Sequence, residues 1–288
     1  MPEMPEIQAH AERLTERFAG RTLEKFVPFN FTALKTAVPA PDTAYGHQLI
    51  EVGRRGKYLL LQFEPTTFVV HLMQGGRLLA DDKLSAKPRG GQARFVFEPM
   101  VRPDGTHDEA ALLLTEQGKE RRAGVWCVSA DDAMSSPPLE HLGPEAASIT
   151  DDELSAAFAA NSMRVHGVLR DQRMIAGIGR RLANEICHRA RISPFANTRK
   201  LGADGASEVG EAIRSCIAES LEHERHRDDM SSSKDRPSAM HSRTGEPCPD
   251  CGDAVRAVEY SGYTVNYCAT CQTGGKVLAD NTTSKFLK

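Results

Sequence analysis

The sequence is poor in aromatic residues and has no excess of positive charge. Phe, Trp and Tyr make up 6% of the 288 residues, and 36 Lys and Arg face 39 Asp and Glu, for a formal net charge of −3. The overall charge gives no reason to expect nucleic acid, because duplex DNA attracts positive charge. No apolar run approaches the roughly 18–20 residues that span a bilayer, and the acidic N-terminus lacks the apolar segment of a signal peptide. We therefore expect a cytoplasmic protein with no membrane partner.

The average charge conceals a division along the chain. Residues 1–160 carry 17 Lys and Arg against 23 Asp and Glu, whereas residues 161–200 carry nine basic residues and only two acidic ones. Association is steered by the local field at a surface, so this basic segment can attract DNA although the whole chain is acidic. A solvated basic helix face explains the same segment without any partner, and the charge alone leaves both alternatives open.

Four of the seven cysteines lie near the end of the sequence in two pairs. Cys248 and Cys251 form one pair with two residues between them, and Cys268 and Cys271 form the other. In a chain with no signal peptide, this spacing predicts one structural Zn²⁺ held by four thiolates, with no open position for catalysis. Residues 254–267, between the pairs, are rich in Val and Tyr, and we expect them to form a β-hairpin.

The pattern of apolar residues predicts several domains. Apolar positions recur at helical spacing to about residue 18, and short β-rich runs with Gly and Pro breaks follow to about residue 130. Thr150 and Glu153 match a capping box that begins a helix, and helical patterning continues to about residue 224. Residues 225–245 are polar, which predicts a mobile loop. We predict a multidomain α+β protein with an N-terminal helix and β-sandwich over residues 1–135, a helical domain over residues 145–225, and a zinc finger with a basic tail over residues 240–288.

The first residues suggest a nucleophile. Removal of Met1 before the small residue Pro2 would expose a secondary amine. An α-amino group has a pKa of roughly 8, whereas a lysine side chain has a pKa of about 10.4. A fraction of the terminal amine is therefore unprotonated at neutral pH and can attack a carbonyl carbon. Glu3 follows directly and can act as a general acid or base. Many proteins begin with these residues by chance, so the tripeptide needs support from other motifs.

Two further motifs suit phosphate binding. Lys57 lies between a glycine turn and an apolar strand, which is a good position for a phosphate contact or simply an exposed basic turn. Gly177 and Gly179 directly precede a predicted helix, which we expect Pro194 to end. Open N–H groups at the start of such a helix form a seat for phosphate, and the basic charge around them favours a clamp for the DNA backbone.

In combination, these motifs resemble the formamidopyrimidine-DNA glycosylase and endonuclease VIII family. The similarity extends over nearly the whole chain, in the same order. The matching segments are Met1–Glu6, Gly56–Leu59, His71–Gly76, Leu142–Glu145, Gly177–Pro194 in a helix-two-turns-helix motif, and Gly245–Cys248 at the start of the finger.

The resemblance implies a bacterial, nucleoid-associated monomer that excises oxidised bases from damaged double-stranded DNA and then cuts the strand by β,δ-elimination. Pro2 matches the residue that attacks C1′ and forms an imine. Glu3 matches the glutamate that assists sugar opening and proton transfer, and Glu6 matches a second carboxylate at the site. Lys57 matches the lysine that binds phosphate beside the lesion. The implied DNA-binding residues are Gln74, Arg121, Arg180, Asn184 and Lys276.

The sequence departs from the family pattern where side chains fill the space left by an extruded base. Gln74 stands in place of a methionine, and Ala123 in place of a phenylalanine. Arg180 replaces an asparagine, although arginine can still bind phosphate. Because of these changes, a second alternative is an inactive paralogue that binds damaged DNA without cutting it. A zinc-ribbon module joined to an unrelated β-rich enzyme, with no preference for damage, is a third alternative.

Overall fold

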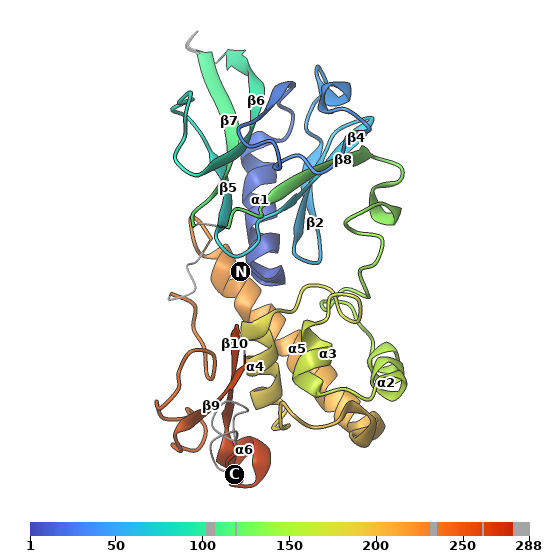
Figure 1. Ribbon diagram of the computed structural model, residues 1–288, viewed down its shortest axis with the longest axis vertical. Coiled ribbons are helices and arrows are strands. Elements are labelled where there is room, and N and C mark those ends of the chain that lie inside the picture. The colour runs from blue at the N-terminus through green and yellow to red at the C-terminus, as the bar shows by residue number, and fades with distance from the viewer. Residues whose placement is uncertain (102–106, 119, 231–234, 261, 279–288) are drawn as a thin grey trace. The chain divides into compact units, whose positions relative to one another are not determined.

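The computed structural model describes residues 1–101, 107–118, 120–230, 235–260 and 262–278 (Figure 1). The chain divides into two compact units. The first contains residues 1–2 and 6–141, and the second contains residues 3–5 together with the chain from residue 142 onward. The multidomain α+β prediction is confirmed. The proposed separation of a helical domain over 145–225 from a finger with a basic tail over 240–288 stays a prediction, and the part of the tail over 279–288 lies outside the described residues.

The first unit is a sandwich of two four-stranded antiparallel sheets. One sheet has the strand order β1-β6-β7-β5, and the other has the order β2-β3-β4-β8. The elements are α1 (Met4–Phe18), β1 (Leu23–Pro28), β2 (Glu51–Arg55), β3 (Tyr58–Gln62), β4 (Thr66–His71), β5 (Gly76–Ala80), β6 (Gly91–Val101), β7 (His107–Glu116) and β8 (Gly124–Ser129).

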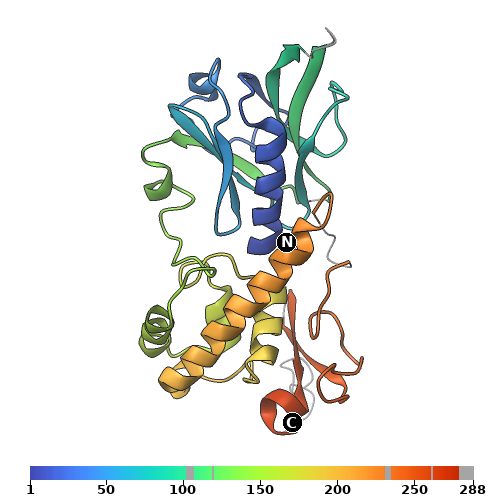
Figure 2. The same cartoon turned by 180° about the vertical axis from the view of Figure 1, so that it is seen from behind.

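Aromatic rings join the two sheets. Phe68 on β4 is fully buried, and its ring centroid lies 5.7 Å from that of Phe26 on β1 and 5.2 Å from that of Phe95 on β6. Helix α1 contacts both sheets, because His10 Nε2 lies 2.7 Å from the Leu78 carbonyl oxygen and the Val52 N–H donates to Thr15 Oγ1. The helix therefore lies along the side of the sandwich where the sheets diverge (Figure 2).

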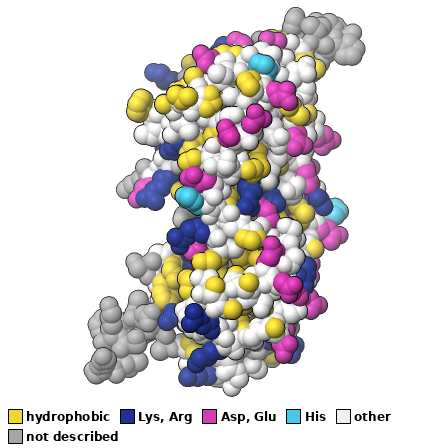
Figure 3. All heavy atoms as spheres, turned by 90° about the vertical axis from the view of Figure 1, so that its right-hand side faces the viewer, with side chains coloured by type: hydrophobic (Ala, Val, Ile, Leu, Met, Phe, Trp, Pro, Cys, Tyr) yellow, Lys and Arg dark blue, Asp and Glu magenta, His cyan; other side chains and the backbone are white. Residues whose placement is uncertain are grey.

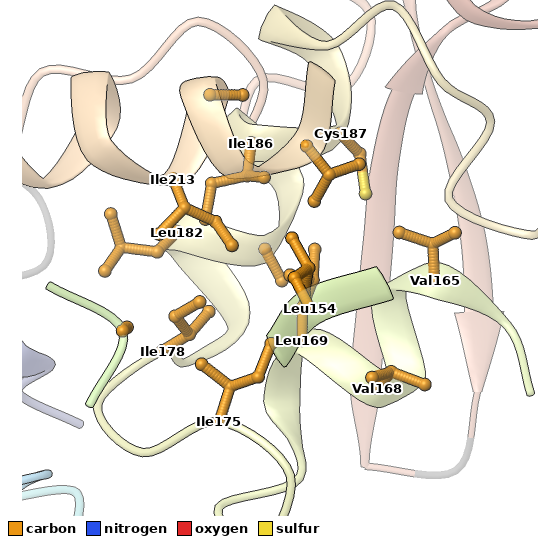
Figure 4. Close-up of a cluster of buried hydrophobic side chains, with 14 of the residues drawn as sticks. Leu154, Val165, Val168, Leu169, Ile175, Ile178, Leu182, Ile186, Cys187 and Ile213 are labelled. Atoms are coloured by element: carbon orange, nitrogen blue, oxygen red, sulfur yellow. The ribbon is translucent and has the colours of Figure 1, made fainter. Parts of the chain in front are cut away.

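The second unit is a helical bundle with a two-stranded hairpin. Its core consists of apolar side chains from all the longer helices, including Leu154, Leu169, Leu182, Ile186 and Ile213 (Figure 4). The predicted capping box is confirmed, since the Thr150 hydroxyl accepts from the Glu153 N–H and the Glu153 carboxylate accepts from the Thr150 N–H. The elements are α2 (Asp151–Ala160), α3 (Val165–Arg170), α4 (Arg180–Arg189), α5 (Gly202–Arg225), β9 (Val255–Tyr260), β10 (Tyr263–Cys268) and α6 (Ala269–Thr273).

The second unit corrects two predictions. Helix α4 ends at Arg189 rather than at Pro194, and Arg191 takes a left-handed conformation with φ 53°. The described part of the segment 225–245 is not simply a polar linker, because Met240 is fully buried and its backbone N–H donates to Glu185. Among the described residues, no helix combines the length and the apolar character needed to cross a bilayer.

Phe68 provides a test of the sandwich core. Replacing Phe68 by Ala removes the ring that contacts both sheets, and we expect the free energy of unfolding of the first unit to fall by about 3–5 kcal/mol. Phe31, which is 98% exposed, is the matched control, and Phe31→Ala should change it by less than about 0.5 kcal/mol. Urea unfolding followed by the fluorescence of Trp126 on β8, the single tryptophan, measures both. Equal stabilities for the two variants would contradict this description of the core.

Candidate functional site

The carboxylate of Glu3 is bound to the first turn of α4. Oε1 accepts the Arg181 N–H at 3.0 Å, and Oε2 accepts the Leu182 N–H at 2.9 Å. Both donors belong to the first turn of a helix, whose N–H groups have no partner within the helix and whose dipole favours negative charge. Glu3 is only 3% exposed, so these bonds form away from bulk water and fix the side chain.

Two glycines leave room for Glu3 and Met4 beside the start of α4. A Cβ atom on Gly179 would lie 2.1 Å from Glu3 Oε1, so any side chain there would displace the carboxylate. Gly177 has φ 108°, its carbonyl oxygen accepts the Met4 N–H at 3.0 Å, and a Cβ on it would lie 2.8 Å from Met4 Cβ. The N–H groups of Arg181 and Leu182, which the sequence predicted to be open to phosphate, therefore bind the protein's own carboxylate. A phosphate contact elsewhere at this helix start stays a prediction.

Pro2, Glu6 and Lys57 belong to the first unit and are buried. Lys57 is 5% exposed and follows Gly56, whose φ of 55° makes the tight turn between β2 and β3. Burial lowers the pKa of His71 on β4 to about 4, and the positive charge of Lys57 contributes in the same direction. The His71 ring is therefore neutral at pH 7, and the lysine has an uncharged neighbour.

Two loops of the first unit carry residues that were predicted to bind DNA. Gln74 is exposed in the turn between β4 and β5, and Arg121 is exposed between β7 and β8. The second loop is held at its base by Glu116, whose Oε2 accepts the N–H groups of Arg122 at 2.5 Å and Ala123 at 2.6 Å. Ala123 is 1% exposed, so the position at which the family pattern has an aromatic ring is a small buried residue here.

Helix α4 carries two more of the predicted DNA contacts, and the two differ in exposure. Arg180 is partly exposed, and its Nη1 donates to the Gly262 carbonyl oxygen at the hairpin turn. Asn184 is fully buried, and its Nδ2 lies 3.0 Å from His241 Nδ1. A direct contact of Asn184 with DNA stays a prediction, and in this structure its side chain organises its neighbours.

A stack of rings fastens the hairpin to the helices of the second unit. The Tyr260 and Tyr263 rings are nearly parallel with centroids 4.8 Å apart, and the Tyr263 ring stacks on His166. The guanidinium of Arg170 lies 4.3 Å from the centre of the Tyr263 ring, and that of Arg164 contacts Tyr260. Burial lowers the pKa of His166 to about 3, with Arg170 as a further cause, so the ring is neutral within the stack.

The four cysteines of the finger come together as predicted. Their sulfur atoms all lie within 4.8 Å of one another, with Cys248 Sγ 3.9 Å from Cys271 Sγ and Cys251 Sγ 3.4 Å from Cys268 Sγ. Zinc–sulfur bonds of about 2.3 Å in a tetrahedron place the sulfurs about 3.8 Å apart, so this set of donors fits Zn²⁺. Lys276 follows α6 and is exposed.

Several residues that organise these features are not evident from the sequence motifs. They are Arg181, Glu185, His188 and His241 in the second unit, and Glu116 in the first. The spacing of Arg181, Asn184, Glu185 and His188 is a signal, because residues at i, i+3, i+4 and i+7 share one face of a helix. From sequence alone, a polar stripe on a basic helix predicts a face that contacts solvent or DNA. In the structure, Arg181, Asn184 and His188 are buried.

Basic side chains line one side of the visible surface in the lower part of Figure 3. Lys and Arg lie along the left there, and toward the right edge acidic side chains stand together with further Lys and Arg. A local group of basic side chains can present a positive field to a partner although the chain is acidic overall.

Comparisons with known proteins agree with this architecture. Residues 1–120 match the model of the formamidopyrimidine-DNA glycosylase N-terminal domain, and residues 142–232 match that of the formamidopyrimidine-DNA glycosylase H2TH domain. The formamidopyrimidine-DNA glycosylase of Thermus thermophilus is 31% identical, over 96% of this chain and 100% of that protein. An uncharacterized formamidopyrimidine-DNA glycosylase-like protein of Mycobacterium tuberculosis is 39% identical, over 53% of this chain and 98% of that protein.

Solved structures are similar over nearly the whole chain. The crystal structure of the Thermus thermophilus MutM (Fpg) protein has a TM-score of 0.77 at 28% identity and covers 96% of this chain and 100% of its own. The Lactococcus lactis enzyme, bound non-covalently to DNA containing an abasic site, has a TM-score of 0.81 at 17% identity, with 94% and 99% of the two chains covered, and indicates the fold alone. By its two matching domains and its full-length relative, the chain belongs to the formamidopyrimidine-DNA glycosylase family.

Proposed function

We propose that this protein is a DNA glycosylase and abasic-site lyase that removes oxidised bases from double-stranded DNA as a monomer. Family membership supports the glycosylase activity, and the similarity to an enzyme bound to abasic-site DNA supports damaged DNA as the partner. The observation that carries the proposal is the binding of Glu3 at the start of α4, which we call the seat of Glu3. A carboxylate held by two backbone N–H groups directly follows the residue whose nitrogen would be the nucleophile.

In the proposed mechanism, the nitrogen of a mature N-terminal Pro2 attacks C1′ of the damaged nucleoside. The bond from C1′ to the base breaks, and its electron pair leaves with the base, which takes up a proton, while the proline nitrogen loses its own proton. The C1′–O4′ bond then opens and O4′ is protonated, and the iminium that forms between C1′ and the nitrogen favours loss of a proton from C2′. Glu3 exchanges protons with the sugar, because a carboxyl group beside the reacting atoms can act as a general acid or base. The base must leave the stack for this attack, since C1′ is not accessible within the duplex.

The remaining residues would bind and orient the DNA. Lys57 would contact a phosphate beside the lesion. Gln74, Arg121, Arg180 and Lys276, all exposed or partly exposed, would contact the backbone or the space left by the extruded base. Asn184 would act by positioning His241. Cys248, Cys251, Cys268 and Cys271 would hold one Zn²⁺, which supplies structure to the hairpin and no chemistry.

The amine mechanism is tested by blocking the proline nitrogen. Inserting Ser between Met1 and Pro2 places this nitrogen in a peptide bond, and we expect borohydride-trapped adducts with abasic-site DNA to fall at least roughly a hundredfold, as for loss of a covalent nucleophile. Binding to the same DNA, measured without borohydride, controls for folding.

Undiminished trapping by the extended protein would exclude Pro2 as the nucleophile. If the wild-type protein binds abasic-site DNA but neither cuts it nor forms a borohydride-trapped adduct with it, the protein is the inactive paralogue. A panel of duplex and single-stranded oligonucleotides with oxidised purine, oxidised pyrimidine or an abasic site separates these outcomes.

The seat of Glu3 is tested at Gly179. The methyl group of Gly179→Ala would displace a carboxylate oxygen that lies 2.1 Å from its position, and we expect single-turnover base excision to slow at least roughly tenfold, because small misplacements of reacting groups are costly. Gly167→Ala is the matched control, since its methyl group would meet only Met163 Cε at 3.8 Å. Equal excision rates for the two variants would show that the seat has no part in catalysis.

Removal of the metal should affect the two units differently. A chelator that extracts zinc should abolish DNA binding in an electrophoretic shift assay, because the hairpin loses its four-sulfur support. The fluorescence of Trp126, in the first unit, should stay unchanged. DNA binding that survives complete extraction of the metal would contradict the structural role of the finger.

A further inference from the structure

Three polar side chains on one face of α4 hold the segment that leads into the finger. Arg181 Nη2 donates to the Pro237 carbonyl oxygen at 2.7 Å, and Asn184 contacts His241. The Glu185 carboxylate accepts three successive backbone N–H groups, those of Ala239, Met240 and His241, at 2.7, 3.1 and 2.8 Å. Hydrogen bonds from residues 181–185 of the helix thus join it to this segment.

His188 continues this face to the metal ligands. Its side chain is 5% exposed, and Nε2 lies 3.3 Å from Cys248 Sγ but 3.7 Å from Asp250 Oδ2, beyond hydrogen-bond distance. A metal-bound cysteine is a thiolate without a proton, so the imidazole must be the donor in a bond between these atoms. Four thiolates around Zn²⁺ leave a formal excess of negative charge, and N–H donors around such a centre stabilise it.

The opposite end of the same helix holds Glu3. The N–H groups of Arg181 and Leu182 donate to Glu3, and His188 lies in the last turn of α4. At 1.5 Å per residue, the ten-residue helix is about 15 Å long and behaves as one rigid element. Whatever fixes its last turn therefore also constrains the N–H groups of its first turn.

We propose that His188 is a positioning residue that links the metal centre to the seat of Glu3. With zinc bound, Cys248 is fixed and anchors His188, and the segment 239–241 is fixed against Glu185. Without zinc, both anchors of α4 loosen and the first-turn N–H groups hold Glu3 less tightly. This inference concerns the free protein and does not depend on the lyase mechanism, so it can fail while the proposed function stands.

The wild-type full-length protein provides the first test. Hydrogen exchange, followed by mass spectrometry of peptides covering residues 178–189, is compared with and without zinc in the absence of DNA. We expect removal of zinc to speed exchange at the start of α4 at least roughly tenfold, because the anchors of the helix are lost. Exchange that is the same in both forms would overturn the coupling.

Substitutions at His188 then identify the residue that carries the link. His188→Phe removes the donor but keeps the volume, and we expect zinc loss to a competing chelator to become roughly 10–100-fold easier, as for other outer-sphere partners of a metal site. Zinc-loaded His188→Phe should show faster exchange at the start of α4, whereas His188→Gln, which keeps an N–H donor, should restore both properties.

Arg189→Gln is the matched control, because Arg189 is the exposed neighbour that pairs with Glu219, and it should retain zinc as the wild type does. His188→Phe that retains zinc and exchanges like the wild type, or a His188→Gln variant as weak as His188→Phe, would overturn the role of the hydrogen bond.

Discussion

The bonds between the Glu3 carboxylate and the first turn of α4 constrain most of the second unit. A buried carboxylate without donors would cost several kcal/mol, and the unpaired N–H groups of a buried helix start would add to that cost. Each satisfies the other here, at 3.0 and 2.9 Å. The arrangement explains why Gly177 and Gly179 precede the helix, since a side chain on either would collide with Met4 or Glu3. It also explains why residues 3–5 belong with the second unit rather than with the rest of α1.

The same helix shows how a polar sequence can be internal. Arg181 and Glu185 use their charges on backbone carbonyl and N–H groups of residues 237–241, and His188 uses its imidazole on a cysteine sulfur. Hydrogen bonds to charged groups are stronger than neutral ones, and they specify one geometry for a segment that has few apolar side chains. Polar side chains of α4 thus join the bundle to the segment that leads into the finger, beside the small apolar cluster around Met240.

The sequence predicted the elements whose signals are local. The helix to residue 18, the capping box at Thr150, the hairpin and the four-cysteine cluster depend on periodicity or spacing within a short stretch of chain, and all are present. The seat of Glu3 could not be predicted in this way, because it joins residues 178 or more positions apart. An open helix start looks the same in a sequence whether phosphate or a distant carboxylate fills it. Helix α4 ends at Arg189 before Pro194 is reached, because the N–H groups of Ala190 and Ile192 donate to the carbonyl oxygens of Ile186 and Cys187 and Arg191 takes a left-handed conformation.

In the proposed mechanism, the N-terminal residue beside the fixed carboxylate of Glu3 performs the chemistry. Mass-spectrometric mapping of the borohydride-reduced adduct between the natural protein and abasic-site DNA tests it most directly. The account predicts that the modified peptide begins with Pro2 and carries the sugar on its terminal nitrogen. Attachment at Lys57 or at any other lysine would contradict it.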